Sequence, residues 1–142
     1  MKKVFVDTNV IIDFLADRKP FSEFAAKLFQ LAQNGRIKVY ISSISINNTY
    51  YILRQVSSHR KALKLIENIL GLVTVKATDE EIFLKAIKSG FADFEDGIQY
   101  FSAKSVPGID VIVTRNARDF KKIEIPVLSA ETTVKLILNE KL

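Results

Sequence analysis

Short runs of β-branched and aromatic residues recur along this chain, and each is followed by a stretch with helical spacing. The runs lie at residues 4–6, 39–41, 73–75, 111–113 and 126–128. Runs of this kind indicate strands, and Pro126 is typical of a strand at a sheet edge. Because the strands alternate with helices over short connections, the pattern predicts an α/β fold with a mainly parallel central sheet.

The longer stretches carry helix end signals as well as helical spacing. We expect helices near residues 10–15, 21–33, 46–53, 60–70, 78–88 and 94–104, and after residue 129. A capping box from Thr78 to Glu81 opens one of them, and Gly90 ends it. No repeat or linker interrupts the sequence, and 142 residues suit one domain, so we expect residues 1–142 to form a single domain.

Composition excludes several classes of protein. The chain has no cysteine, so disulfides, thiolate catalysis and cysteine-based zinc sites are excluded. No stretch approaches the roughly 20 apolar residues that span a bilayer, and the chain turns polar at Asp7, too early for a signal peptide. We therefore expect a soluble, cytoplasmic protein. The net charge of +5 suits a polyanionic partner, and equally a well-solvated surface.

Polar and acidic side chains gather where open α/β sheets bind ligands, beyond the carboxyl ends of the strands. Those that follow predicted strands are Asp7, Thr8, Asn9, Asn47, Asn48, Thr114, Asn116 and Asp119, and those that open the helix before the 111–113 strand are Asp93, Glu95 and Asp96. Converged carboxylates repel one another, and a hard divalent cation is the simplest way to neutralise them. Such a cation on a basic protein points to phosphodiester hydrolysis.

Each of these side chains also has a purely structural interpretation. Asp7 would serve equally as the N-cap of the helix that contains Val10. Capping, turn formation or solvent exposure would explain Asn48, Asp93, Glu95, Asp96 and Asp119. His59 is the only histidine and lies in a polar run, so we expect an exposed loop residue rather than a catalytic base.

Three segments together resemble the PIN domain family. They are Val4-Phe5-Val6-Asp7-Thr8-Asn9, Asp93-Phe94-Glu95-Asp96-Gly97-Ile98-Gln99-Tyr100 and Val113-Thr114-Arg115-Asn116-Ala117-Arg118-Asp119-Phe120. The resemblance implies a three-layer α/β/α fold and an endoribonuclease that uses Mg²⁺ or Mn²⁺ held by acidic residues. Many members of this family are toxins of toxin–antitoxin pairs, so an antitoxin and a second copy of the chain are candidate partners.

Carried over one position at a time, the family pattern is only partly acidic here. It implies Asp7, Asp96, Asn116 and Asp119 as catalytic residues, Asp7, Asp96 and Asn116 as metal ligands, and Thr8, Asn9, Asn48, Asp93, Glu95 and Thr114 as supporting residues. Asn48 stands where the family usually has its second acid, a glutamate. An amide oxygen brings no charge, so we expect weak metal binding. Asp93 and Asp96 should share a helix face, with Glu95 pointing elsewhere.

Basic residues near the predicted site suit RNA phosphates. Arg115 and Arg118, with Lys121 and Lys122, follow the 111–113 strand, and a second basic cluster lies at 54–61. A solvated charged loop would explain them equally well.

The alternative to a metal-dependent ribonuclease is a module of the same fold that binds nucleic acid or protein without cutting. Phosphatases with an Asp-x-Asp pair are disfavoured because position 9 is asparagine. The chain also has no glycine-rich phosphate-binding loop, so an NTPase is excluded.

Overall fold

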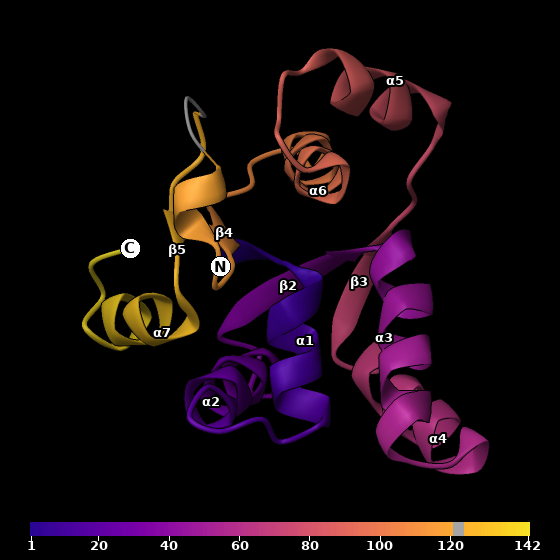
Figure 1. Cartoon of the computed structure of the whole chain (residues 1–142). Coiled ribbons are helices and arrows are strands. Elements are labelled where there is room, and N and C mark those ends of the chain that lie inside the picture. Colours follow the sequence, from indigo (N-terminus) through magenta and orange to yellow (C-terminus); the bar gives the residue numbers. More distant parts are fainter. Residues whose placement is uncertain (121–123) are drawn as a thin grey trace.

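The computed structural model describes residues 1–120 and 124–142. Its centre is a five-stranded sheet in the order β3-β2-β1-β4-β5 (Figure 1). The strands are β1 (Lys2–Val6), β2 (Ile37–Ser42), β3 (Val73–Lys76), β4 (Val111–Val113) and β5 (Val127–Leu128). Every described pair of neighbouring strands is parallel, which confirms the predicted α/β fold class.

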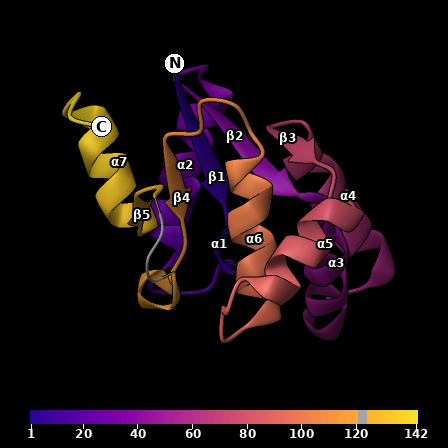
Figure 2. The same ribbon diagram turned by 90° about the horizontal axis from the view of Figure 1, so that it is seen from above.

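Helices cover both faces of the sheet and form the outer layers. They are α1 (Thr8–Leu15), α2 (Ser22–Gln33), α3 (Ser43–Val56), α4 (His59–Leu70), α5 (Glu80–Lys88), α6 (Phe94–Lys104) and α7 (Ala130–Leu138), with a short 3-10 turn, η1, at Ala117–Asp119. Helices α5 and α6 lie on one face, and α1, α2 and α7 lie on the other (Figures 1 and 2). Within the described ranges, no helix is both long and apolar enough to cross a bilayer.

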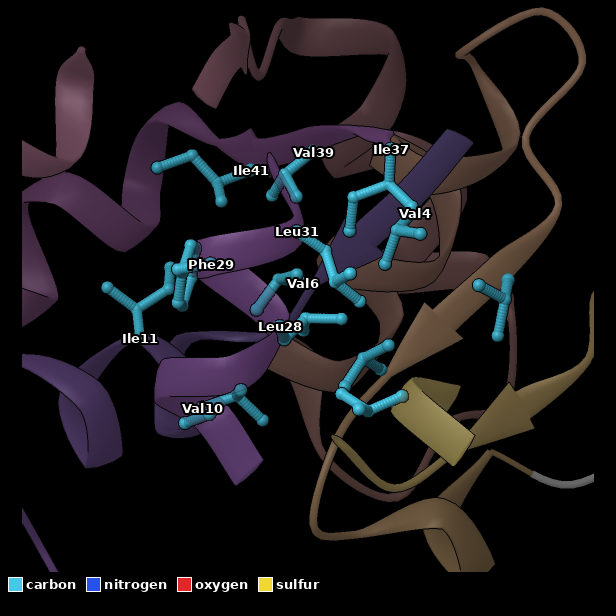
Figure 3. Packing of buried hydrophobic residues seen from close by; sticks show 14 of the residues in the cluster. Val4, Val6, Val10, Ile11, Leu28, Phe29, Leu31, Ile37, Val39 and Ile41 are labelled. Carbon is cyan, nitrogen blue, oxygen red and sulfur yellow. The ribbon is translucent and has the colours of Figure 1, made fainter. Parts of the chain in front are cut away.

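The core follows from the alternation of side chains along the strands. Val4 and Val6 point to the face covered by α1, α2 and α7, and Figure 3 shows them packed with Leu28 from α2. Phe5 points to the opposite face and packs with Tyr100 of α6. Burial of each such side chain contributes about 1.5–3 kcal/mol, so the central strand β1 is anchored from both sides.

The start of α5 differs from the expected capping box. Asp79, not Thr78, is the N-cap, and its Oδ1 accepts a hydrogen bond from the Ile82 amide at 3.0 Å. The Thr78 hydroxyl lies 2.6 Å from the Ser42 hydroxyl at the end of β2. The prediction of Thr78 as the cap was wrong because the Thr78 hydroxyl instead contacts Ser42 of β2, which joins β2 to the loop before α5.

Candidate active site

An open cleft of about 1430 Å³ lies at the carboxyl ends of β1 and β4, between α1, α3 and α6. Of the predicted site residues, those that line it are Asp7, Thr8, Asn9, Asn48, Asp93, Glu95, Asp96, Arg115, Asn116, Arg118 and Asp119. Thr114 is buried behind this surface, at 1% exposure. The parallel sheet thus brings together side chains that are far apart in sequence.

Asp7 is held rigidly at the end of β1. Its Oδ1 accepts a hydrogen bond from the Thr8 amide at 2.7 Å, and its Oδ2 accepts one from the Thr114 hydroxyl at 2.7 Å. Asp7 is therefore the N-cap of α1, which starts at Thr8, earlier than expected. Burial raises the pKa of Asp7 above its usual value, and Glu95 and Asp93 add to this, although both hydrogen bonds oppose the rise.

Asp96 lies in the first turn of α6 and is half-buried. Burial raises the pKa of Asp96 to about 7, and the negative charges of Asp93, Asp7, Asp119 and Glu95 contribute to the rise. Among the described residues, no lysine or arginine forms an ion pair with these acids. These acidic side chains therefore lie together in the cleft without an ion-pair partner among the described residues.

Glu95 turns into the cleft, contrary to the prediction that it points elsewhere. Its Oε1 accepts hydrogen bonds from Asn48 Nδ2 at 2.9 Å and from the Thr8 hydroxyl at 3.3 Å. The prediction was wrong because Glu95 lies on the same face of α6 as Gln99, four residues later, and this face contacts α1 and α3. Asp93 is the N-cap of α6, and its Oδ1 accepts a hydrogen bond from the Asp96 amide. Asn48 of α3 thus contacts a carboxylate from α6.

A buried polar cluster beneath the cleft connects α1, α3 and α6. The Thr8 and Ser45 hydroxyls lie 2.7 Å apart, and Gln99 Nε2 donates to both, at 3.2 and 3.1 Å. Gln99 is completely buried, yet sequence reasoning assigned it no role. The sequence held one signal for this residue. Gln99 lies between the apolar residues Ile98 and Tyr100, and because it follows Glu95 by four residues, it shares a helix face with Glu95.

The loop after β4 forms the opposite wall. The Thr114 hydroxyl donates to Asp7 and accepts a hydrogen bond from the Asn116 amide at 3.1 Å, so Asn116 is fixed relative to Asp7. Asn116 and Asp119 are exposed and border the cleft, while the neighbouring Phe120 is buried.

The basic residues divide into two groups. Arg115 and Arg118 line the cleft, as does Arg18, which no sequence signal singled out. Lys121 and Lys122 lie outside the described residues.

The second basic cluster is not part of the cleft. That cluster consists of Arg54, Arg60 and Lys61. The neighbouring His59 begins α4, so its assignment to a loop was wrong, although it is exposed as expected. Its Nδ1 lies 2.7 Å from the Tyr50 hydroxyl. The helix begins one residue before the expected range of 60–70 because Ser58 is its N-cap. The Ser58 hydroxyl accepts a hydrogen bond from the Lys61 amide.

The donor chemistry of the cleft fits a hard divalent cation. Asp7 and Asp96 offer carboxylate oxygens, and Asn116 offers an amide oxygen. Burial, with the neighbouring negative charges, raises the pKa of both carboxyls, so a nearby cation would stabilise their ionised forms. In the part of the chain that is described, no three Asp, Glu, His or Cys side chains are close enough to hold one ion. Mg²⁺ often binds through one or two carboxylates, with waters and substrate phosphates completing its shell, so this set suits that mode.

Comparison with known proteins identifies the family. Residues 3–118 match the model of the PIN domain family. A curated relative, ribonuclease VapC1 from Aquifex aeolicus, is 29% identical over 135 residues, covering 92% of each chain. Among solved structures, DNA-bound VapBC from Salmonella typhimurium has a TM-score of 0.69 at 24% identity, covering 92% of this chain and 99% of that one.

A second solved structure extends the likeness. VapC20 from Mycobacterium tuberculosis, described as a sarcin-ricin loop cleaving toxin, has a TM-score of 0.60 at 18% identity, covering 77% of this chain and 86% of that one. The family match runs from β1 into η1 and ends one residue before Asp119, so it includes most of the residues that line the cleft. On this match, the chain belongs to the PIN domain family.

Proposed function

We propose that this protein is a divalent-metal-dependent endoribonuclease that hydrolyses RNA phosphodiester bonds in the acidic cleft. The observation that carries the proposal is that Asp7, at the end of β1, and Asp96, in the first turn of α6, line one cleft, and that neither forms an ion pair with a described lysine or arginine. The relative from Aquifex aeolicus is named a ribonuclease, and its alignment with this protein covers 92% of the chain. This likeness supports the same reaction here.

Asp7 and Asp96 would hold Mg²⁺ or Mn²⁺, with the Asn116 side-chain oxygen as a third ligand. When bound, the cation supplies positive charge that offsets the charge developing on the phosphodiester. Thr114 and the Thr8 amide keep the Asp7 carboxylate in one orientation. Asp119 borders the same cleft and, from the loop after β4, would supply a further carboxylate near the metal ligands.

Asn48 would take a different part from the glutamate usual at its position. Its Nδ2 donates to Glu95, so it orients a carboxylate instead of supplying one. We infer that the chain belongs to a PIN subgroup in which this asparagine is normal, and that Glu95 provides the charge that Asn48 lacks. Asn9 and Asp93 complete the polar surface of the cleft.

The biological setting follows from the same likeness. Solved structures similar to this chain are VapBC complexes, so we propose that the protein is the toxin of a toxin–antitoxin pair and that its partner is a small antitoxin protein. Residues 1–142 would act as one domain in the cytoplasm, and a homodimer is the proposed oligomer.

A second function is favoured by one specific observation. The described residues include no group of three acids, histidines or cysteines placed to hold one metal ion, as expected for a PIN fold that binds RNA or protein without cutting it. Under this alternative, loss of an acidic side chain would leave RNA binding unchanged or tighter, since repulsion of phosphate is reduced.

An RNA cleavage assay with Mg²⁺ or Mn²⁺ separates the two functions. We expect cleavage by the wild-type protein that stops on chelation, and a loss greater than about 100-fold in Asp7→Asn. Asp17→Asn is the matched control, because Asp17 is exposed, lies outside the cleft and has a φ of 50° that asparagine tolerates. Metal-independent cleavage, or full activity in Asp7→Asn, would contradict the proposal.

A further inference from the structure

One buried carboxylate beside the cleft binds two arginines. Asp13 in α1 is 1% exposed, and its two oxygens face different partners. Arg18 Nε lies 2.9 Å from Oδ1, and Arg115 Nε lies 2.8 Å from Oδ2. Neither Asp13 nor Arg18 has a role in the proposed reaction, so this cluster needs its own explanation.

The cluster has more positive charge than its structural role requires. A buried carboxylate is stabilised by one well-placed cation, since a single pair is already neutral. Here two guanidinium groups share one carboxylate, which leaves a local charge of about +1. An anion bound between the arginines would neutralise that charge.

Both arginines are fixed before any ligand arrives. Arg18 uses Nε for Asp13 and donates from Nη2 to the Asn9 carbonyl at 3.2 Å. The Arg115 guanidinium lies over the Phe21 ring, 4.2 Å from its centroid. A guanidinium held in one plane loses little entropy when it binds phosphate, for which its fork of donors is suited.

Their place in the cleft matches the path of an RNA strand. Arg18 and Arg115 line the same cleft as Asp7 and Asp96. Asp7 is the N-cap of α1, and Asp13 lies six residues further along the chain, a rise of about 9 Å along a helix. A strand with one phosphate at the acidic residues would therefore place a neighbouring phosphate near the arginines.

We propose that Arg18 and Arg115 form a phosphate-binding pair for the RNA backbone beside the cleavage position, and that Asp13 is the residue that positions them. This inference rests on the proposed ribonuclease function and adds to it a substrate-binding subsite. The pair contacts the strand, whereas Asp13 acts only through the two arginines.

The test is RNA binding measured against salt concentration, with metal chelated so that cleavage does not interfere. The probe is a short, fluorescently labelled single-stranded RNA of mixed sequence, and binding is followed by anisotropy. For Arg18→Gln and for Arg115→Gln, we expect weaker binding and a slope of log K against log salt that is shallower by about 0.7, the value for one lost contact to single-stranded nucleic acid.

Two further variants separate binding from structure. Arg36→Gln is the matched control, because Arg36 is exposed beside the amino end of β2, away from the cleft, and it should bind as wild type. Arg115→Lys keeps the charge, so it should restore the slope while binding less tightly than wild type, since the fork is lost. In the cleavage assay, the glutamine variants should raise KM more than they lower kcat.

Each result has a definite meaning. If the glutamine variants lose thermal stability but keep the wild-type slope, the arginines are structural and the inference is overturned. Shallower slopes in a protein that never cleaves RNA would support the phosphate pair and overturn the ribonuclease. A wild-type protein that neither binds nor cleaves RNA would overturn both.

Discussion

Replacing Asp96 with asparagine should make the metal-free protein more stable at alkaline pH. The pKa of this half-buried carboxyl is raised from 3.8 to about 7. The folded state therefore binds its proton more tightly than the unfolded state does, and wild-type stability falls as pH rises from about 4 through about 7. An asparagine side chain cannot ionise, so the Asp96→Asn variant lacks this loss.

The size of the effect follows from the shift and its environment. At about 1.4 kcal/mol per pH unit, the full rise corresponds to at most about 4 kcal/mol. Solvent screens a half-buried group, so we expect a gain in the free energy of unfolding of about 1–2 kcal/mol at pH 8. The gain should be small at pH 4, close to the unfolded-state pKa of 3.8, because below that pH the carboxyl is protonated in both states.

Urea denaturation in chelator at pH 4, 6 and 8 measures this difference. Asp17→Asn again serves as the control, since replacing the exposed Asp17 removes a negative charge without altering the cleft. Saturating Mg²⁺ or Mn²⁺ should then stabilise the wild type and not Asp96→Asn, because the metal supplies the charge that the cleft lacks. An Asp96→Asn variant less stable than wild type at pH 8 would refute the account of Asp96 as an unneutralised carboxylate.

The polar contacts of the cleft give further testable outcomes. Thr114→Val removes the hydroxyl that orients Asp7 and should lower the rate of metal-dependent cleavage by about 10–100-fold, at a temperature where circular dichroism shows both proteins folded. Equal cleavage rates would exclude an orienting role for Thr114. Gln99→Leu removes two buried hydrogen bonds and should cost about 1–3 kcal/mol in urea denaturation, and a neutral result would mean that the amide contributes nothing net. Asn48→Asp places a second carboxylate against Glu95, so it should destabilise the metal-free protein and tighten Mn²⁺ binding in calorimetry; unchanged affinity would separate position 48 from the metal site.

The sheet could be predicted from the sequence because each strand is marked by its own short run of apolar residues. The run 4–6 ends at Asp7, and the run 111–113 ends at Thr114, so the strands and their polar ends could be read together. The structure adds that Thr114 donates to Asp7, a contact across 107 positions of sequence. Periodicity shows which residues follow a strand, but the pairing of side chains depends on strand order.

The contacts that were missed depend on how helices pack. Glu95 meets Asn48 because the fold brings the first turn of α6 beside α3, and no spacing within either helix contains that information. Arg18 and Arg115 come from two distant loops and meet at Asp13. A charged residue at an otherwise apolar helix position, such as Asp13 after Ile12, was a visible signal of burial with a partner, although the sequence does not identify the partner.

Capping and chemistry are not competing interpretations of Asp7. The same carboxylate starts α1 through the Thr8 amide and faces the other acids of the cleft. The helix N-terminus favours negative charge there, yet burial still raises the pKa, so the site retains a carboxylate that would gain from a cation. Asparagine caps a helix about as well as aspartate. Asp7→Asn should therefore keep α1 intact, with unchanged far-ultraviolet circular dichroism, while abolishing metal binding. Loss of helix in that variant would mean that the charge, and not only the hydrogen bond, is needed to begin α1.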